Sequence, residues 1–429
     1  MACPGELHVQ LCQRETRQPT LRAWRLVSAF VFLLSIWSTS FSGATTSPNA
    51  SSEKHRGDAH SVRVPAIDGN DIRFSRLSTA QGLSQTQVNE IVQDDQGFIW
   101  FGTQYALDRY DGYEFKVFTH DPAHANSLSC VYIHSLFKDR SGSLWVGCDQ
   151  FLDRFDCLHE TFTHYRIDAG EVANYVSQIS QDRTGMLWLA TGSGLFRLNP
   201  DTAQMVHYVH DPANSSSLGS NEVRYTLEDR TGRFWVADGE NLEEFDRENG
   251  QVLSRVRLSE GLRLVSFYED HLGTFWITYI RNSSSSGLAV LDRSTNTVIP
   301  YSIYDRKSGE ELPAGFMTAI EDNSQTLWLA SFGAGLLKLD REHGVFIRYR
   351  NSPENLESIA DGRVMSLRGD REGNVWVGLR IPYKGSRFSP PSRLPHRLPS
   401  FPPELVTHVG TRMTRIGAHI PGAWAYSRW

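Results

Sequence analysis

Aspartates recur along the chain in a pattern that could bind metal ions. Seven of them are followed six residues later by a tryptophan, and in six cases a glycine lies three residues after the aspartate. They are Asp94, Asp139, Asp182, Asp229, Asp270, Asp322 and Asp370. A calcium ion needs roughly six to eight oxygen ligands in one place, whereas each of these carboxylates stands alone in its own segment. We therefore interpret them as turn caps that accept hydrogen bonds from backbone N–H groups two residues on.

The histidines form no motif with catalytic spacing. His120 and His124 lie in a polar connector, and His207 and His210, three residues apart on an expected strand, point to opposite faces. The segment 192–194, Gly-Ser-Gly, indicates a hairpin turn, because no helix follows it to bind phosphate. No Ser-His-Asp arrangement is supported by spacing. We predict no catalytic residue, no bound metal and no cofactor.

The tryptophans show which elements must position any site. They are Trp100, Trp145, Trp188, Trp235, Trp276, Trp328 and Trp376, and they lie 41 to 52 residues apart. Recurrence at this period indicates one small unit copied many times. Each unit contains an apolar strand ending at the aspartate, the Trp strand, a Leu-x-x-(aromatic or Leu)-(Asp or Asn) strand and an outer strand with two spaced apolar residues. Four short strands per unit predict the blade of an all-β propeller, with the tryptophan as core between blades.

The ends of the repeat region decide how the ring closes. Residues 72–77, Ile-Arg-Phe-Ser-Arg-Leu, match an outer strand but precede the first unit. We therefore expect them to complete the last blade of a seven-bladed propeller spanning residues 71–382. After Trp376 the third strand pattern does not return, which leaves open whether the seventh blade is complete. The segment 383–429 is rich in Pro and Arg, and we expect it to be a disordered tail. Whether this tail results from a truncation, results from a frame shift or is a genuine part of the protein stays open.

The N-terminal region has the features of an export signal. Arginines precede an apolar run at 26–37, and small residues follow at 42–44. Residues 1–44 are predicted to be a secretory signal peptide, with an uncleaved membrane anchor as the alternative. Polar residues 45–70 are expected to be a flexible linker. With either alternative, the pattern predicts that the repeats lie outside the cytoplasm.

Composition and cysteine count limit the class of partner and the disulfides. The chain has 429 residues and a net charge of -6 without a basic stripe over the repeats, which argues against nucleic acid. After signal removal Cys130, Cys148 and Cys157 remain. Export permits a disulfide between Cys148 and Cys157, which share a repeat. The alternative is that the cysteines are small buried residues on strands.

Two phrases carry a family resemblance: Asp-Asp-Gln-Gly-Phe-Ile-Trp-Phe-Gly-Thr at 94–103 and Leu-Asp-Arg-Tyr-Asp-Gly-Tyr-Glu-Phe at 107–115. The chain resembles the two-component regulator propeller family over residues 71–380. The resemblance implies the periplasmic or otherwise exported sensor region of a bacterial receptor whose output is a histidine kinase or a diguanylate cyclase. The sequence contains neither a kinase His box nor a nucleotide-binding Gly-rich stretch, so we expect a sensing domain without its own output module.

The remaining candidates lie where connectors enter the innermost strands of a propeller. Convergent polar and aromatic groups at such a concave mouth suit ligand recognition. The candidates are Tyr132, Tyr175, Asn221, Arg224, Arg263 and Arg363. They predict a small-molecule or oligosaccharide ligand; a receptor partner and self-association also stay open.

One alternative function is that of a lyase or glycosidase, which would need paired carboxylates. These could come from Glu90, Glu222, Glu269 and Glu321. The other is a protein-interaction scaffold.

Overall fold

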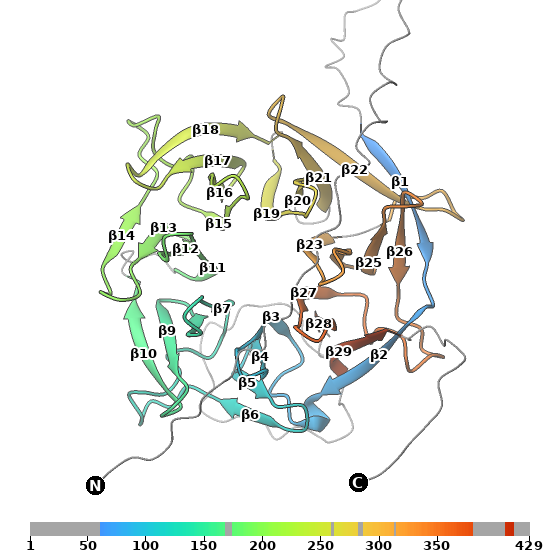
Figure 1. The fold of residues 1–429 in the computed structure, drawn as a ribbon, viewed down its shortest axis with the longest axis horizontal. Helices are drawn as coiled ribbons and strands as arrows, with labels where there is room; N and C mark the ends of the chain where they lie inside the picture. Colours follow the sequence, from blue (N-terminus) through green and yellow to red (C-terminus); the bar gives the residue numbers. More distant parts are fainter. Residues whose placement is uncertain are drawn as a thin grey trace, which may run out of the picture. The chain divides into compact units, whose positions relative to one another are not determined.

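The computed structural model describes residues 61–167, 174–258, 261–281, 286–312 and 315–380, together with the backbone of residues 408–415. Its strands form a ring of four-stranded antiparallel blades around a central axis (Figure 1). This confirms the predicted all-β propeller. The described part contains one 3₁₀ helix, η1 (Thr79–Gln81), and no α-helix.

Each of the first four blades runs outward from an innermost strand. Blade 1 comprises β3 (Val88–Gln93), β4 (Ile99–Thr103), β5 (Leu107–Tyr110) and β6 (Phe115–Phe118). Blade 2 comprises β7 (Ser135–Lys138), β8 (Leu144–Gly147), β9 (Phe151–Asp156) and β10 (Thr161–Arg166). Blade 3 comprises β11 (Val176–Gln181), β12 (Leu187–Thr191), β13 (Gly194–Leu198) and β14 (Met205–Tyr208). Blade 4 comprises β15 (Val223–Glu228), β16 (Phe234–Asp238), β17 (Asn241–Asp246) and β18 (Gln251–Arg257).

The last three blades complete the ring. Blade 5 comprises β19 (Arg263–Glu269), β20 (Phe275–Ile280), β21 (Ser286–Asp292) and β22 (Thr297–Asp305). Blade 6 comprises β23 (Gly315–Glu321), β24 (Leu327–Phe332), β25 (Gly335–Asp340) and β26 (Val345–Tyr349). Blade 7 comprises β27 (Val364–Gly369), β28 (Val375–Leu379), β29 (His408–Arg415) and β2 (Ile72–Ser78).

A repeated hydrogen-bond arrangement explains the six-residue interval between Asp and Trp. In blade 3, Asp182 Oδ1 accepts from the backbone N–H groups of Thr184 (2.9 Å) and Met186 (3.1 Å), while Oδ2 accepts from Trp188 Nε1 at 2.8 Å. The same indole-to-carboxylate bond occurs in all seven blades, at 2.7–3.0 Å. Burial raises the pKa of Asp182, but hydrogen bonds from Thr184 and Trp188 outweigh it and hold the pKa below its usual value. Each aspartate therefore caps its turn and anchors the core tryptophan.

The hairpin turn that follows each aspartate needs a left-handed residue. Gly185 has φ 92° and Gly232 has φ 92°, which glycine adopts without steric cost. In the sixth repeat Gln325 takes this place with φ 59°. The turn geometry is therefore kept even where the sequence departs from glycine.

Adjacent blades are joined by side chains at the ends of the innermost strands. Each joining side chain accepts a hydrogen bond from the backbone N–H that follows the hairpin aspartate of a neighbouring blade. The bonds are Arg140 N to Gln181 Oε1 (3.0 Å), Arg183 N to Glu228 Oε2 (2.6 Å), Arg230 N to Glu269 Oε2 (2.8 Å), His271 N to Glu321 Oε2 (2.7 Å) and Arg371 N to Gln93 Oε1 (2.9 Å). Between blades 1 and 2 the contact is instead an ion pair from Lys138 Nζ to Asp95 Oδ1, at 2.7 Å.

The ring closes in blade 7, where segments from both ends of the described chain meet. Strand β2 pairs with β29, which in turn pairs with β28. The expectation that residues 72–77 complete the last blade is therefore confirmed. The expectation of disorder needs correction at residues 408–415, because the backbone there forms β29 and occupies the otherwise unpaired edges of β28 and β2. Residues 383–407 and 416–429 lie outside the described residues.

A second correction concerns the predicted linker. Residues 62–68 form strand β1 (Val62–Asp68), which pairs in parallel with β22 and with β26 and so joins blades 5 and 6 (Figure 1). Ala66 of β1 is 1% exposed and packs in the core shared by these blades. Burial of this side chain and the backbone pairing hold the segment in a fixed conformation. The signal-peptide segment 1–44 and residues 45–60 lie outside the described residues.

Candidate ligand-binding site at the axial mouth

The six predicted site residues all lie where the innermost strands begin. Tyr132, Tyr175, Asn221 and Arg363 are in the connectors before β7, β11, β15 and β27. Arg224 is the second residue of β15, and Arg263 is the first residue of β19. Corresponding ends of these strands surround the axis (Figure 1). The structure therefore places the candidates at one end of the ring, which we call the mouth.

Two tyrosines at the mouth are brought together by a histidine. The His134 ring lies 4.5 Å from the Tyr132 ring and 5.2 Å from the Tyr175 ring, measured between centroids. Gln87 Nε2 donates to the Tyr132 hydroxyl at 3.4 Å, which links this group to the connector of blade 1. His134 itself is held by Asp149, with Nε2 and Oδ1 2.7 Å apart. These three rings form an aromatic arc over blades 2 and 3, which offers flat surfaces to a ligand.

The arginines at the mouth are partly neutralised. Glu222 Oε1 accepts from Arg224 Nε at 3.1 Å and lies 3.8 Å from Arg263 NH1. Two guanidinium groups thus share one carboxylate and leave one positive charge in excess. Arg363 stands apart from this pair and binds Asp361 at 2.6–2.8 Å. The hydrogen bond that Arg363 donates to the Asp361 carboxylate raises the pKa of Arg363.

The side-chain oxygen of Asn221 has a structural partner. This Oδ1 atom accepts from the backbone N–H of His210 at 2.7 Å and ties two loops together. Sequence reasoning missed His134 and Asp361, which complete the aromatic and the charged groups. The one available signal was position: His134 directly precedes β7, and Asp361 lies two residues before Arg363.

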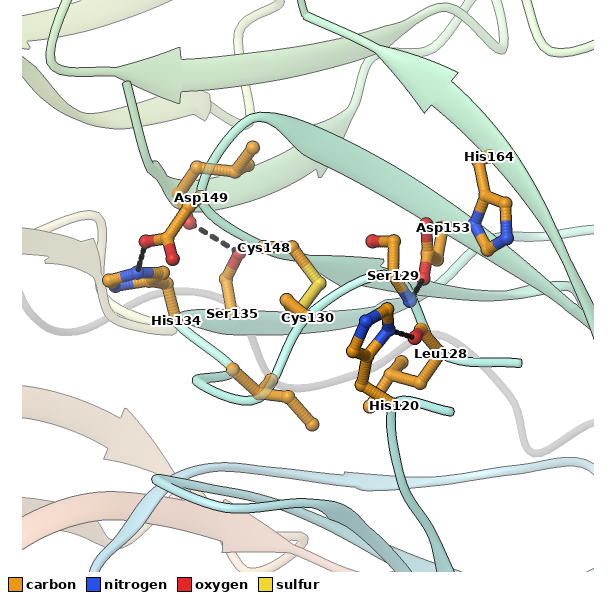
Figure 2. Close-up of a disulfide and its surroundings, with 12 residues drawn as sticks. His120, Leu128, Ser129, Cys130, His134, Ser135, Cys148, Asp149, Asp153 and His164 are labelled. Carbon is orange, nitrogen blue, oxygen red and sulfur yellow. Dashed lines mark hydrogen bonds and ion pairs between the residues drawn. A yellow bond between two sulfur atoms is a disulfide. The ribbon is translucent and has the colours of Figure 1, made fainter. Parts of the chain in front are cut away.

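A disulfide holds the connector that carries part of the aromatic arc. Cys130 and Cys148 are bonded, with their Cα atoms 5.8 Å apart, whereas Cys157 is free and exposed. The Cys148–Cys157 disulfide that export would permit does not form, and the alternative of unpaired buried cysteines is wrong for Cys130 and Cys148, which are bonded, and for Cys157, which is exposed. Figure 2 shows the bond between the connector and the end of β8, with His134 and Asp149 to one side and Ser129 and Asp153 to the other. The spacing of the cysteines in the sequence does not predict the Cys130–Cys148 disulfide, because Cys130 lies in the connector before β7 and only the fold brings it close to Cys148, which follows β8.

Buried acids on the third strands accept hydrogen bonds from the backbone of the connectors that lead into the innermost strands. Ser129 N donates to Asp153 Oδ2 at 2.7 Å, and Ser84 N donates to Asp108 Oδ1 at 3.1 Å. In blade 4, Gly219 N donates to Glu243 Oε1 at 3.0 Å. Burial raises the pKa of Asp108 to about 7. The mouth is thus built on connectors with fixed backbones.

The carboxylates considered for hydrolysis have other partners. Glu269 and Glu321 accept the backbone N–H groups that join the blades, and Glu222 pairs with arginines. Glu90 lies on the innermost strand β3, where burial raises its pKa to about 7 against the opposing effects of the Ile91 N–H and of Arg368. In the described part of the chain, no cluster of three or more His, Cys, Asp or Glu has metal-binding geometry.

The blades, the Asp–Trp hydrogen bonds and the mouth define a β-propeller with a polar and aromatic axial site. The family model of the two component regulator propeller matches residues 82–105 and 127–150, which supports the resemblance seen in the sequence. A curated relative, histidine kinase P4 of Formosa agariphila, is 34% identical over 68 residues, or 16% of this chain and 5% of that protein. The chain thus spans a small part of that relative.

Solved structures with the same fold include proteins of different activities. The extracellular domain of a putative hybrid two component system from B. thetaiotaomicron has a TM-score of 0.59 at 21% identity, over 72% of this chain and 40% of that chain. Virginiamycin B lyase from Staphylococcus aureus has a TM-score of 0.56 at 12% identity, over 80% of this chain and 99% of that chain. These similarities establish the fold alone. Over the residues that the structure describes, no helix has the length and apolarity to cross a membrane.

Proposed function

We propose that this chain is the ligand-sensing propeller domain of an exported bacterial signalling receptor. Three observations support the proposal: the match to the two component regulator propeller model, the fold shared with the extracellular domain of a two-component system, and the mouth. The single observation that carries ligand binding is the aromatic arc of Tyr132, His134 and Tyr175 at the same end of the ring as Arg224 and Arg263.

The chemistry of the mouth favours a small polar ligand. Aromatic faces contact sugar or other planar rings, while the arginine pair around Glu222 has one uncompensated positive charge. A small molecule or an oligosaccharide with an acidic group satisfies both. Signalling then requires that the ligand bind one arrangement of receptor domains more tightly than another. A receptor partner or self-association would supply the output, and any membrane contact would be through the N-terminal segment.

A thermal-shift screen of the full chain tests the proposal. Neutral and acidic oligosaccharides, small metabolites and peptides are compared, because a ligand at about 100 times its Kd stabilises the folded state by about 2.7 kcal/mol. The expected result is a rise in Tm with an acidic ligand that is lost in Tyr132→Ala and Arg263→Ala. Tyr113→Ala is the matched control, since Tyr113 is 93% exposed on an outer turn. A rise that persists in both mouth variants, or no rise with any compound class, contradicts the proposal.

A further inference from the structure

The third strand of blade 7 is joined to its blade differently from its equivalents. In the first six blades a short turn links the second strand to the third, as at residues 192–193 and 333–334. In blade 7, residues 380–407 separate β28 from β29 in the sequence. A longer connection makes pairing within the chain entropically less favourable. The advantage of β29 over a strand from another polypeptide is therefore smaller in blade 7 than it would be in the other blades.

The pairing of β29 with its inner neighbour is also short. Three residue pairs join β29 to β28, whereas four to six pairs join the second and third strands of each of the first six blades. On its outer side β29 pairs with all seven residues of β2 (Figure 1). Strand β29 is thus held mainly by β2.

A leucine is buried at one position of the third strand in every other blade. This position pairs with the second residue after the core tryptophan. Each leucine packs with the tryptophan of its own blade in the hydrophobic cluster shared with the next blade. The six leucines, each 0% exposed, are Leu107, Leu152, Leu195, Leu242, Leu288 and Leu336.

Blade 7 has a glycine at this position. Gly410 pairs with Gly378 of β28, two residues after Trp376, and with Leu77 of β2 on the other side. The cluster between blades 7 and 1 contains Trp376, with Leu77 packed against it, but a glycine has no side chain to add to it. Glycine inside a strand also weakens the strand. The closing blade therefore lacks one side chain that the other six blades bury.

We propose that the slot between β28 and β2, which we call the closing slot, accepts a strand from another polypeptide in place of β29. The partner is an extended segment with a leucine opposite Gly378 and a leucine or aromatic residue three positions later, as in the third strands of the other blades. Main-chain hydrogen bonds give such strand addition its affinity, and side-chain pockets give its specificity. The incoming strand pairs the edges of β28 and β2 and supplies the leucine that β29 lacks.

The pairing of the other third strands favours a different polypeptide over a second copy of this chain. The six strands that carry the matching pattern are β5, β9, β13, β17, β21 and β25. Each of them is hydrogen-bonded to a neighbour on both sides. A second copy could donate one of them only by opening a complete blade. A segment that is extended and unpaired before it binds has no such cost.

A peptide that copies residues 334–342 of blade 6 is the probe. It carries Leu336 and Leu339 at the required spacing, with charged residues that favour solubility. Titration of the full chain into the fluorescein-labelled peptide is expected to give a saturable rise in fluorescence anisotropy. The matched peptide with the change Leu336→Gly should bind about tenfold or more weakly, because burial of one leucine is lost. Equal binding of the two peptides, or no saturable binding, overturns the proposal.

Hydrogen exchange shows where the peptide binds. At saturation, the backbone amides of residues 408–415 should exchange faster, because the incoming strand displaces β29. The amides of β28 should stay protected, because they remain paired. Unchanged exchange of β29 with the peptide bound would place the peptide elsewhere on the molecule, and the closing slot would then be excluded as its site.

The substitution Gly410→Leu supplies the missing leucine from within the chain. This variant should have a higher Tm and should bind the peptide about tenfold or more weakly, because its β29 competes better for the slot. Val206→Leu, at a 48% exposed position of β14, is the control and should change neither quantity. Peptide affinity that stays the same in Gly410→Leu contradicts the proposal.

The oligomeric state of the full chain separates the proposed partner from a second copy. Size-exclusion chromatography at several concentrations should show the same species with and without the peptide. A dimer that the peptide dissociates would identify a second copy as the occupant and would overturn the assignment to another polypeptide. These experiments leave the mouth unaltered, so their failure does not bear on the proposed sensing function.

Discussion

The backbone N–H of Arg371 in blade 7 donates a 2.9 Å hydrogen bond to Oε1 of Gln93 in blade 1, across 278 residues of sequence. Equivalent bonds join blades 2 to 3, 3 to 4, 4 to 5 and 5 to 6. Ring closure at this end therefore uses the same contact as ordinary blade stacking, and Gln93 also donates to Glu372 at 3.0 Å.

Gln93→Ala should lower the free energy of unfolding by about 1–3 kcal/mol, because the Arg371 N–H is left without its acceptor. Denaturant unfolding of the full chain measures the change. Gln204→Ala, at an exposed position in blade 3, is the control and should leave the midpoint unchanged. Equal midpoints for Gln93→Ala and the control would show that this contact does not contribute to closure.

Trp188→Phe tests whether the indole hydrogen bond to Asp182 matters beyond packing. The substitution removes the donor to Asp182 Oδ2 and leaves a small cavity, so a loss of about 2–4 kcal/mol is expected. Thermal and denaturant unfolding measure it, with Val206→Ala at a 48% exposed position of the same blade as the control. A loss no larger than that of the control would refute the structural role assigned to the pair.

Stability should depend on pH through Asp108. Burial raises its pKa in the folded state to about 7, opposed by hydrogen bonds from Ser84, while the unfolded chain ionises near the usual value of about 3.8. Between these values the folded state binds more protons, so stability falls as pH rises, by at most about 1.4 kcal/mol per pH unit for this one group. Unfolding measured from pH 5 to 8 should show a shallower slope in Asp108→Asn than in the unmodified chain. Asp111→Asn, at an exposed turn, should keep the original slope.

Removing the Cys130–Cys148 disulfide should destabilise the fold and loosen the mouth. Closure of a loop between residues 18 apart in sequence corresponds to about 2–4 kcal/mol. Cys130→Ser, compared with Cys157→Ser, is expected to lower Tm and to raise the amide exchange rate of residues 129–134. Unchanged exchange in this connector would show that Asp153 and the backbone hydrogen bonds hold it without the disulfide.

A chain shortened to residues 1–407 lacks β29 and should lose the closure of blade 7. The edges of β28 and β2 would then expose unpaired backbone groups. Limited proteolysis is expected to cut near residues 72–78 much faster than in the full chain, and Tm should fall. A chain ending at residue 415 keeps β29 and is the control. Equal proteolysis of the two shortened chains would show that β29 does not contribute to closure.

Much of the fold was predictable because the buried residues repeat. Asp and Trp recur at fixed spacing since each pair is joined by the same hydrogen bond, and β2 was recognisable from Phe74 and its neighbours as an outer strand. Strand β1 was not, because its parallel pairing with two blades follows from their proximity in space. Strand β29 carries no copy of the repeat pattern.

The candidate site was predictable only in its location. Connector positions follow from the repeat, so the six candidates lie at the mouth. Their mutual contacts depend on side-chain direction, which explains why His134 was missed and why Asn221 has a structural role. Cys130 and Cys148 lie in different elements of one blade, and only the folded geometry brings them within bonding distance.

Strand β1 determines how mechanical load enters the ring. Five residue pairs join it to β22 and three join it to β26, so it is bonded to the rims of two blades at once. Tension on the chain before Val62 is therefore borne first by the boundary between blades 5 and 6, and reaches the closing strand β2 only after β1 has been sheared from both neighbours. A movement of the N-terminal segment would thus act on the boundary between blades 5 and 6, and the pairing of β2 in blade 7 would not bear this load while β1 stays paired.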